Sequence, residues 1–233
     1  MFNSRIIFLC FIFFISSCKS ILQKQEQFAF PDNQNAKEYS LDQVFFDKNK
    51  NILLDTKTKQ PIDGIVVIRE QDVITSKINY KNGVQEGSTY TYYKNGKTKT
   101  KINISKGITN GLAYDYFESG SIKKVANFKN GTLDGTTRFY DQNGNLNGEM
   151  DFKNGKKDGF SRVYYVSGSL KAQFSNKNGL TDGLMEMYLE NGSLCYQILY
   201  INDKIVSGKH VYGREFTNAE LVNFEHALGA KCE

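Results

Sequence analysis

Tyrosines recur at a fixed interval along the chain, and their rings offer the clearest capacity for binding chemistry. Five stand 24 residues apart and two more stand two positions before the first two: Tyr92, Tyr116, Tyr140, Tyr164 and Tyr188, with Tyr90 and Tyr114. Aromatic faces suit both peptides and glycans. Cross-strand aromatic stacks also stabilise a sheet by roughly 0.2–1 kcal/mol per pair, so a structural role is the simpler interpretation. Both interpretations stay open, and the seven tyrosines form our candidate binding face.

A second periodic set is acidic, and each member precedes a recurring glycine. It comprises Asp63, Asp134, Asp158 and Asp182, with Glu86 and Asn110 in the same position elsewhere. A row of carboxylates could bind calcium, but the position accepts asparagine and lacks the Asp-x-Asp-x-Asp spacing of calcium loops. Asp-Gly is also a favoured turn pair in its own right. We therefore interpret these residues as parts of turns.

Residues suited to catalysis or metal binding do not gather anywhere in the sequence. The two histidines, His210 and His226, are sixteen residues apart and have no Cys/His cluster at zinc spacing. A Gly-x-Ser-x-Gly elbow, a Walker loop and a Rossmann fingerprint are all missing from the sequence. The sequence therefore predicts no catalytic residue, no metal ligand and no cofactor, in a chain that is not an enzyme.

The amino terminus has the pattern of a processing segment. A short basic start, residues 1–5, precedes an apolar run at 6–15, which is too short for a membrane-spanning helix of about 20 residues. The Ile-Ser-Ser-Cys sequence that ends at Cys18 resembles the bacterial lipobox, which implies lipidation of Cys18. An ordinary signal peptide with an incidental cysteine is the alternative. A multiply acylated cysteine would hold the protein firmly on a membrane of the bacterial envelope, in the periplasm or at the surface.

The remaining cysteines of the mature chain, Cys195 and Cys232, are a candidate pair. Cys10 would leave with the signal and Cys18 would carry the lipid. In an oxidising compartment a Cys195–Cys232 disulfide would tie the C-terminus to the last repeat, and would stabilise it by ~3–4 kcal/mol in the chain-entropy account. Two separate thiols, one of them buried in a strand, are the alternative.

The elements that must position these residues are internal repeats. Glycines recur at three places in a unit of about 24 residues. The opening glycines are Gly64, Gly87, Gly111, Gly135, Gly159, Gly183 and, more faintly, Gly208; nine positions later come Gly96, Gly120, Gly144, Gly168 and Gly192; twenty positions later come Gly107, Gly131, Gly155 and Gly179. Asn-Gly pairs between short apolar runs indicate tight hairpin turns. Apolar residues two apart, as at Met150 and Phe152, indicate strands with one buried face.

Written as DGxxxxYYxNGxLKxxxxFKNGxx, this unit resembles the MORN repeat variant of bacterial proteins, often grouped under the YwqK-type antitoxin heading. The resemblance covers about residues 61–208. It lapses in the first copy, where Gln71-Asp72 replaces Asn-Gly, and at Lys106-Gly107, where the asparagine is lost. The resemblance implies stacked hairpins and, through its heading alone, an antitoxin or immunity partner of a toxin.

The predicted organisation is a lipoprotein signal peptide at 1–17, a polar tether at 18–40, N-terminal capping strands at 41–62, about six repeats at 63–208 and a C-terminal cap at 209–233. The capping strands are expected to begin the sheet and cover its first edge. In the C-terminal cap, Thr217 and Glu220 form a capping box ahead of an apolar helical pattern that ends at Gly229. This pattern predicts a short helix over the last repeat.

The predicted fold is all-β: an elongated antiparallel meander of repeated hairpins with a short C-terminal helix. The formal charge of +5 lies mostly on lysines in turns spread along the chain, so no nucleic-acid partner is expected. The predicted function is a membrane-anchored, non-catalytic interaction module that presents one long face to an unidentified protein partner. Binding of a glycan or peptidoglycan through the tyrosines, and pairing with a toxin, are the alternatives.

Overall fold

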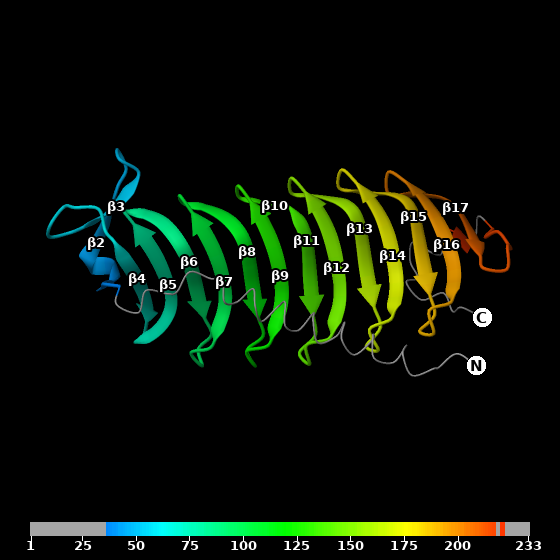
Figure 1. The fold of residues 1–233 in the computed structure, drawn as a ribbon, viewed down its shortest axis with the longest axis horizontal. Coiled ribbons are helices and arrows are strands. Elements are labelled where there is room, and N and C mark those ends of the chain that lie inside the picture. The colour runs from blue at the N-terminus through cyan, green and yellow to red at the C-terminus, as the bar shows by residue number, and fades with distance from the viewer. Residues whose placement is uncertain (1–35, 218–219, 222–233) are drawn as a thin grey trace, which may run out of the picture.

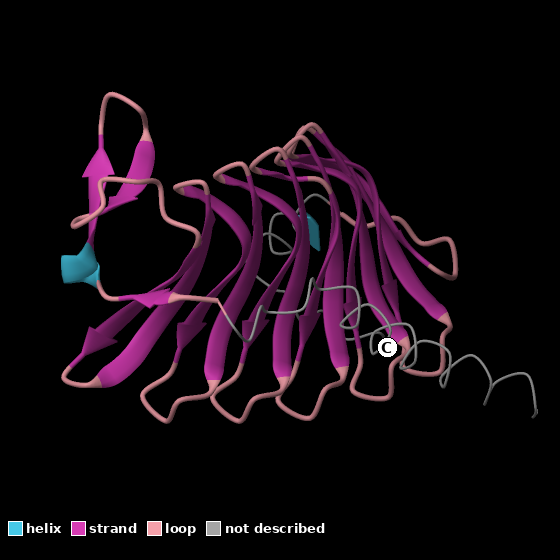
Figure 2. Ribbon diagram, turned by 60° about the vertical axis from the view of Figure 1, so that its left-hand side comes forward, coloured by secondary structure: helices cyan, strands magenta, loops and turns pink. Residues whose placement is uncertain are grey.

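The computed structural model describes residues 36–217 and 220–221 of the chain, and almost all of them belong to one long sheet of hairpins (Figure 1). The strands follow one another in chain order from β4 to β17, except that the short β10 pairs only with β9. Every pairing between consecutive strands of this series is antiparallel, which confirms the predicted all-β meander. Figure 2 shows that the sheet is a single curved layer.

The elements have the following bounds: β1 Glu38–Tyr39, the 3-10 helix η1 Leu41–Gln43, β2 Val44–Asp47, β3 Ile52–Asp55, β4 Gly64–Glu70, β5 Val73–Lys81, β6 Val84–Tyr92, β7 Thr98–Ser105, β8 Ile108–Tyr116, β9 Ile122–Lys129, β10 Thr132–Leu133, β11 Gly135–Tyr140, β12 Leu146–Lys153, β13 Lys156–Tyr164, β14 Leu170–Lys177, β15 Leu180–Tyr188, β16 Leu194–Ile201 and β17 Lys204–His210.

Two-residue turns at one end of the strands explain the Asn-Gly pairs at residues 82–83, 130–131, 154–155 and 178–179. Both turn residues have positive φ, as at Asn154 (50°) and Gly155 (80°), and glycine reaches this region without a Cβ clash. Lys106, with a φ of 51°, adopts the same conformation where the asparagine is lost. The first hairpin turns through Gln71 and Asp72, whose φ angles are 49° and 67°. The hairpin geometry is therefore kept even where the favoured residues are absent.

The sheet has two different faces, because successive side chains of a strand point to opposite sides. One face, here called the core face, carries small and apolar residues that pair directly across the strands. Its members include Val66, Ile78, Thr89, Ile102, Ala113, Ala126, Thr137, Met150, Ser161, Phe174, Met185, Ile198 and Gly208. Ala126 is 1% exposed and Ile198 is fully buried.

The core face is thickest at its two ends, where extra segments pack against it. At the N-terminal end, Tyr39 and Ile62 bury against Val66. At the C-terminal end, Met185, Cys195, Tyr196 and Ile198 form a buried cluster that Phe216 joins. Residues outside the repeats therefore pack against the two end hairpins, each of which has a neighbouring hairpin on one side only.

The N-terminal cap differs in detail from the prediction. β2 and β3 pair with each other as a separate two-stranded sheet, rather than beginning the long one. The edge of β4 is instead met in parallel by Glu38 and Tyr39, two residues that the sequence placed in the tether. A short parallel edge strand of this kind gives no sequence signal, because two residues are too few to show periodicity.

The C-terminal end also departs from the repeat pattern. Gly208 pairs with Ile198, as Met185 does from the other side, so it lies two positions beyond the place of a repeat-opening glycine. A Cβ at Gly208 would lie 2.7 Å from Phe216 Cδ2, so close packing rather than turn geometry requires glycine here. The expected capping box is present, because Glu220 N donates to Thr217 Oγ1 and Thr217 N donates to the Glu220 carboxylate, at 3.3 and 2.8 Å. Most of the predicted helix lies outside the described residues.

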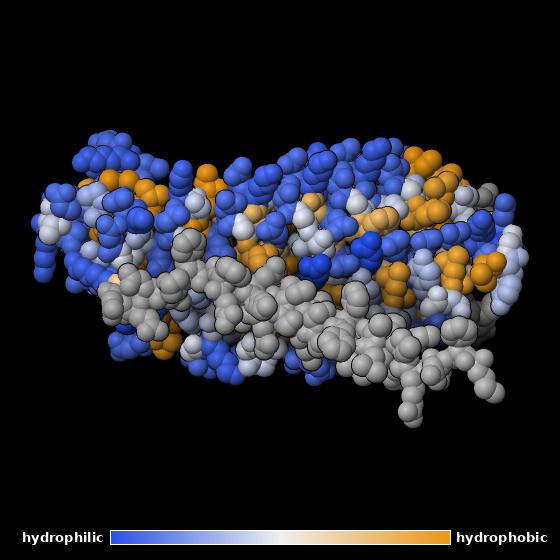
Figure 3. All heavy atoms as spheres, viewed as in Figure 1, coloured by the Kyte–Doolittle hydropathy of each residue, from blue (hydrophilic) through white to orange (hydrophobic). Residues whose placement is uncertain are grey.

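The polar surface of the sheet gives way to apolar side chains at this end (Figure 3). Four aliphatic residues of β15, β16 and β17 are 40–50% exposed: Leu180, Leu184, Ile201 and Val206. Within the described part of the chain, no helix is long and apolar enough to cross a membrane.

Candidate interaction surface

The face opposite the core face carries one unbroken line of side chains, here called the central row. Each member is the direct cross-strand partner of the next, from β4 to β17. The row consists of Val67, Lys77, Tyr90, Lys101, Tyr114, Val125, Arg138, Glu149, Arg162, Gln173, Glu186, Gln197 and Lys209. From β6 to β16 two repeat positions generate it, three and fourteen residues after the opening glycine, because they pair with each other in each of these hairpins. We call this side of the sheet the row face.

The N-terminal half of the central row alternates lysine and tyrosine. Lys77 Nζ is 2.8 Å from Glu38 Oε1 of β1, which neutralises it. Lys101 lies between Tyr90 and Tyr114 in the row, with its Nζ 5.5 Å from the centre of the Tyr90 ring. A cation over a tyrosine face is held by about 0.5–1 kcal/mol at an exposed site.

The C-terminal half of the row is a hydrogen-bonded ladder of charged and amide groups. Glu149 forms ion pairs with both neighbouring arginines: Arg138 Nε lies 3.3 Å from Oε2, and Arg162 Nη1 donates to Oε1 at 3.1 Å. Arg162 Nε then donates to Gln173 Oε1 at 2.8 Å. Beyond it, Gln173 Nε2 and Gln197 Nε2 donate to the two carboxylate oxygens of Glu186, at 3.4 and 2.9 Å. The ladder therefore links the side chains of six neighbouring strands.

Two of the recurring tyrosines donate hydrogen bonds to the carboxylates of this ladder. Tyr164 Oη donates to Glu149 Oε1 at 3.0 Å, and Tyr188 Oη donates to Glu186 Oε2 at 2.9 Å. Burial, reinforced by the Glu149 carboxylate, raises the pKa of Tyr164 to about 12. The pKa of Tyr188 is raised as well, by burial and then by Glu186. Both phenols therefore stay protonated and act as donors at neutral pH.

The five regularly spaced tyrosines lie in a line parallel to the central row, but not as stacked neighbours. Each is paired across the strands with a non-aromatic residue, as Tyr116 is with Ile122 and Tyr140 with Leu146. Ring stacking occurs along the strand instead, with centroids 6.4 Å apart for Tyr90 and Tyr92. The equivalent pair, Tyr114 and Tyr116, is 6.2 Å apart. The expected cross-strand stacks are replaced by alternation of tyrosine with aliphatic residues and threonine.

The acidic residues that precede the repeat glycines act within the turns. Asp134 Oδ2 accepts from Asn154 N at 3.2 Å, and Asp158 Oδ2 accepts from Asn178 N at 3.3 Å. In the first copy, Asp63 Oδ1 accepts from Asn82 N at 2.6 Å. Each carboxylate thus holds the left-handed turn residue of a neighbouring hairpin. Among the described residues, no group of three or more His, Cys, Asp or Glu side chains could hold a metal ion.

The remaining candidate residues lie at or beyond the ends of the described chain. Cys195 is 4% exposed and takes part in a disulfide. Cys232 and the predicted lipid site Cys18 lie outside the described residues, so the Cys195–Cys232 pairing and the lipidation stay predictions.

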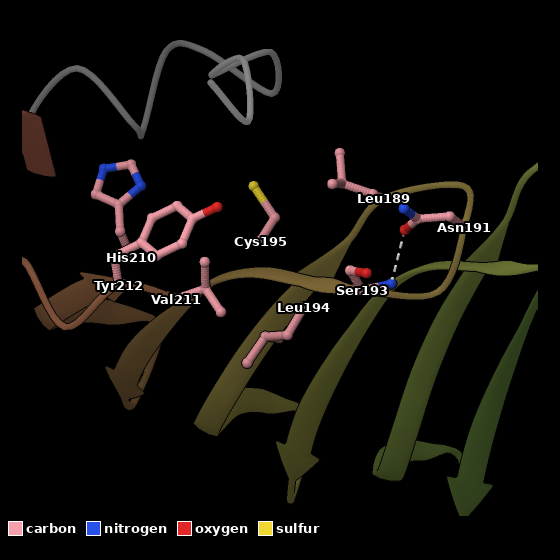
Figure 4. Close-up of a pocket in the computed structure, with 8 residues that line it drawn as sticks. All are labelled: Leu189, Asn191, Ser193, Leu194, Cys195, His210, Val211 and Tyr212. Carbon is pink, nitrogen blue, oxygen red and sulfur yellow. Dashed lines mark hydrogen bonds between the residues drawn. The ribbon is translucent and has the colours of Figure 1, made fainter.

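A hollow of about 330 Å³ lies between the turn that joins β15 to β16 and the end of β17 (Figure 4). Leu189, Asn191 and Ser193 border it on one side and His210 and Tyr212 on the other. His210 Nε2 is 2.8 Å from Arg214 Nη2, which itself pairs with Glu220. Ser193 and Cys195 also line the hollow, and Cys195 is disulfide-bonded.

Sequence reasoning found part of the central row and missed the rest. Tyr90 and Tyr114 drew attention because they neighbour the recurring tyrosines. Glu149, Arg162, Gln173, Glu186 and Gln197 did not, because their residue types change from copy to copy. The available signal was positional: in the last three complete copies, the positions three and fourteen residues after the opening glycine hold only long polar side chains.

Comparison with known proteins agrees with the repeat architecture. No curated protein matches the chain. The family described as MORN repeat variant matches residues 85–105, 109–130, 133–154 and 181–202. The structure continues the same hairpin through β13 and β14, between the third and fourth matched segments. Four hairpin units of this chain therefore match the MORN repeat variant family.

Proposed function

We propose that this protein is a non-catalytic repeat scaffold that is attached to a membrane and binds a protein partner along its row face. The observation that carries the proposal is the central row, which runs unbroken over thirteen strands on the face opposite the core face. Val67, Tyr114 and Val125 in this row are buried, and the longer polar side chains extend beyond them. Tyrosine and arginine are the residues most enriched at the energetic centres of protein interfaces. A single-layer repeat sheet also gives a partner a long surface with regularly spaced contacts.

Membrane attachment rests on the lipobox resemblance at Cys18. A lipid at that residue, followed by a polar segment, would present the sheet to a partner in the bacterial envelope. This location suits a scaffold better than a cytoplasmic antitoxin, unless the toxin itself acts at the envelope. A growth defect on loss of this gene, relieved by deleting a neighbouring gene, would favour the antitoxin role instead.

Site-specific photo-crosslinking in the native membrane tests the proposal. A benzoylphenylalanine at position 140 projects from the row face, whereas the same group at Phe139 projects from the core face of the same strand. We expect one or a few proteins to be captured from position 140 and not from position 139. A Cys18→Ala variant should lose that capture if attachment to the membrane brings the partners together.

Two results would contradict the proposal. Capture of the same proteins from positions 139 and 140 would show that the faces are not distinguished, and capture of no protein from position 140 would leave the row face without a partner. Retention of the protein on peptidoglycan, abolished by changing Tyr116 and Tyr140 in a folded variant, would favour glycan binding instead.

A further inference from the structure

The row face becomes apolar near the C-terminal end of the sheet. Gln197 belongs to the central row, so Leu199 and Ile201, two and four positions further along β16, point to the same side of the sheet. Leu199 is the direct cross-strand partner of Leu184 on β15. These three aliphatic residues therefore lie together on the row face.

Two further apolar residues reach the same face from β13 and β15. Gln173 belongs to the central row, so Ser175 and Lys177 of β14 also point to the row face. Ser175 pairs with Phe160, and Lys177 pairs with Leu180. We call the whole group the apolar patch, and its members are Phe160, Leu180, Leu184, Leu199 and Ile201.

The apolar patch is open to solvent. Four of its members are 39–48% exposed, and Leu199 is half-buried. Together they expose roughly 400 Å² of apolar surface, which is the size of patch that marks an interaction site on a soluble monomer. At its margin the guanidinium of Arg162 lies over the Phe160 ring, with Cζ 4.8 Å from the ring centre.

Other copies of the repeat show that the fold does not require apolar side chains at these places. Phe160 and Leu184 each stand one residue after the opening glycine of a repeat. In two of the three earlier repeats the same position holds Ser88 and Thr136, and each of these hydrogen-bonds to a polar side chain of the next strand. Formation of the sheet therefore does not account for the exposed Phe160 and Leu184.

We propose that the apolar patch is a dimer interface, which packs face to face against the same patch of a second copy of this chain. A two-fold axis sets one surface against itself, so that apolar surface meets apolar surface in both copies. Gln173, Glu186 and Gln197 of the central row border the patch and provide a polar rim.

The area of the apolar patch suits this occupant. Two patches in contact would bury roughly 800 Å² of apolar surface, or about 1,300 Å² in total with the polar rim of an ordinary interface. That total lies within the range of specific protein interfaces, which begins at about 1,200 Å².

The inference does not rest on the proposed function. The apolar patch lies on β13 to β16, whereas the crosslinking position 140 lies on β11. A dimer formed through the patch therefore leaves the row face at β11 free for the partner of the scaffold.

Cysteine crosslinking of the full-length protein in the native membrane tests whether the patch meets itself. Leu184→Cys places a thiol within the patch, where a two-fold axis brings it close to its counterpart in the second copy. Val163→Cys is the matched control, because Val163 is 40% exposed on the core face of β13. We expect mild oxidation to give a disulfide-linked dimer from Leu184→Cys and not from Val163→Cys.

A second pair of variants measures the contribution of the patch to affinity. Phe160→Thr combined with Leu184→Ser introduces residue types that earlier repeats have at this position, so thermal unfolding of the sheet should change little. Val163→Thr makes a similar change on the core face. Sedimentation equilibrium of the full-length protein in density-matched detergent gives the dimer dissociation constant. It should rise at least tenfold in the double variant and less than twofold in Val163→Thr.

Several outcomes would overturn the inference. These are a wild-type protein that stays monomeric, a dimer that the double variant leaves intact, or equal crosslinking from the two cysteines. Capture of a different protein by a benzoylphenylalanine at position 184, without capture of this chain, would assign the patch to that protein instead.

The two proposals fail separately. Capture of a partner from position 140 by a protein that is monomeric would leave the scaffold function standing without the dimer. Loss of that capture with an intact dimer would remove only the scaffold function.

Discussion

Single residues in the hairpin turns show how backbone geometry, rather than side-chain contacts, fixes much of the repeat. Most two-residue turns end in a glycine with positive φ, but the first hairpin ends in Asp72 at 67°. A non-glycine residue in the left-handed region costs roughly 1–2 kcal/mol. The first hairpin therefore carries strain that the hairpins with glycine at this position avoid, and the last hairpin shares it through Asp203, whose φ is 64°.

Replacing Asp72 by glycine should stabilise the protein by about 1 kcal/mol, since the strain is removed and Asp72 is exposed. Chemical denaturation measures this change. The matched control is Gly155→Ala, at the same turn position between β12 and β13, where φ is 80° and a Cβ would meet nothing closer than 3.9 Å. That substitution should destabilise by a similar amount, and a destabilising Asp72→Gly would refute the strain argument.

The Tyr164 phenol gives a second test at this scale. Its pKa is raised to about 12 by burial first and by Glu149 second, while burial also raises that of Tyr196 to about 12. Glu149→Gln should lower the pKa of Tyr164 toward its ordinary value near 10 without reaching it, and should leave Tyr196 unchanged. NMR titration of ring-labelled tyrosine distinguishes the two residues.

The same shift predicts a pH dependence of stability. Because the folded-state pKa of Tyr164 lies above its unfolded value, its contribution to stability is complete below about pH 10 and is lost as pH rises toward 12. Glu149→Gln should shift that loss to lower pH. An unchanged Tyr164 titration in Glu149→Gln would mean that the carboxylate does not act on the phenol.

The positions of whole strands and hairpins are the part of the structure that the sequence predicted best. The Gly and Asn-Gly grid marked the turns, and apolar residues two apart marked strands with one buried face, so the meander followed from local signals. The pairing of β2 with β3 was not predictable, because several short apolar runs near residues 44–68 suit one another equally well. The identity of the core face was also obscured, because the tyrosines of the row face are as periodic as the small residues of the core face.

The central row could not be predicted in full for a related reason. The bulges within each hairpin change which residues face one another, as at Phe139 and Tyr140, where the register shifts. Sequence period alone places Arg138 and Tyr140 on one side, but it does not place Arg138 opposite Glu149. Cross-strand register is a property of the pair of strands, and it becomes visible only when both are in place.

The residues that follow β17 pack closely against Gly208, and this contact can be tested by substitution. Gly208→Val would place a side chain 2.7 Å from Phe216 and 3.2 Å from Leu221, which should displace both. We expect a loss of about 1–3 kcal/mol, as for other overpacked sites. Hydrogen exchange should accelerate in β16, β17 and residues 211–217, while β6 to β9 keep their protection.

Ser207→Val is the matched control for Gly208→Val, because Ser207 is the exposed neighbour on the same strand. It should leave exchange unchanged. Faster exchange along the entire sheet in Gly208→Val would show that the hairpins unfold as one unit rather than in sequence-local steps.

For the whole molecule, the repeat architecture means that each hairpin contacts chiefly the hairpins beside it. Removal of any complete 24-residue unit should then leave a folded, shorter sheet.

The units are not equivalent, however, because each deletion makes a different pair of residues face each other in the central row. Removing 87–110 places Lys77 opposite Tyr114, and removing 135–158 places Val125 opposite Arg162. Removing 111–134 places Lys101 opposite Arg138, and removing 159–182 places Glu149 opposite Glu186.

Like charges directly opposite each other destabilise a strand pair by roughly 0.2–1 kcal/mol, so the deletions of 111–134 and 159–182 should be the less stable pair. Circular dichroism would show whether all four variants fold, and chemical denaturation would rank their free energies of unfolding.

Lys101→Glu should restore stability to the variant without 111–134, because it converts the repulsive pair into an attractive one with Arg138. The same substitution in the intact chain should give no such gain, since Lys101 there faces Tyr114 and not Arg138. If all four deletions unfold the protein, or if Lys101→Glu acts equally in both backgrounds, then the row is not a line of independent neighbour contacts and the hairpins depend on one another over a longer range.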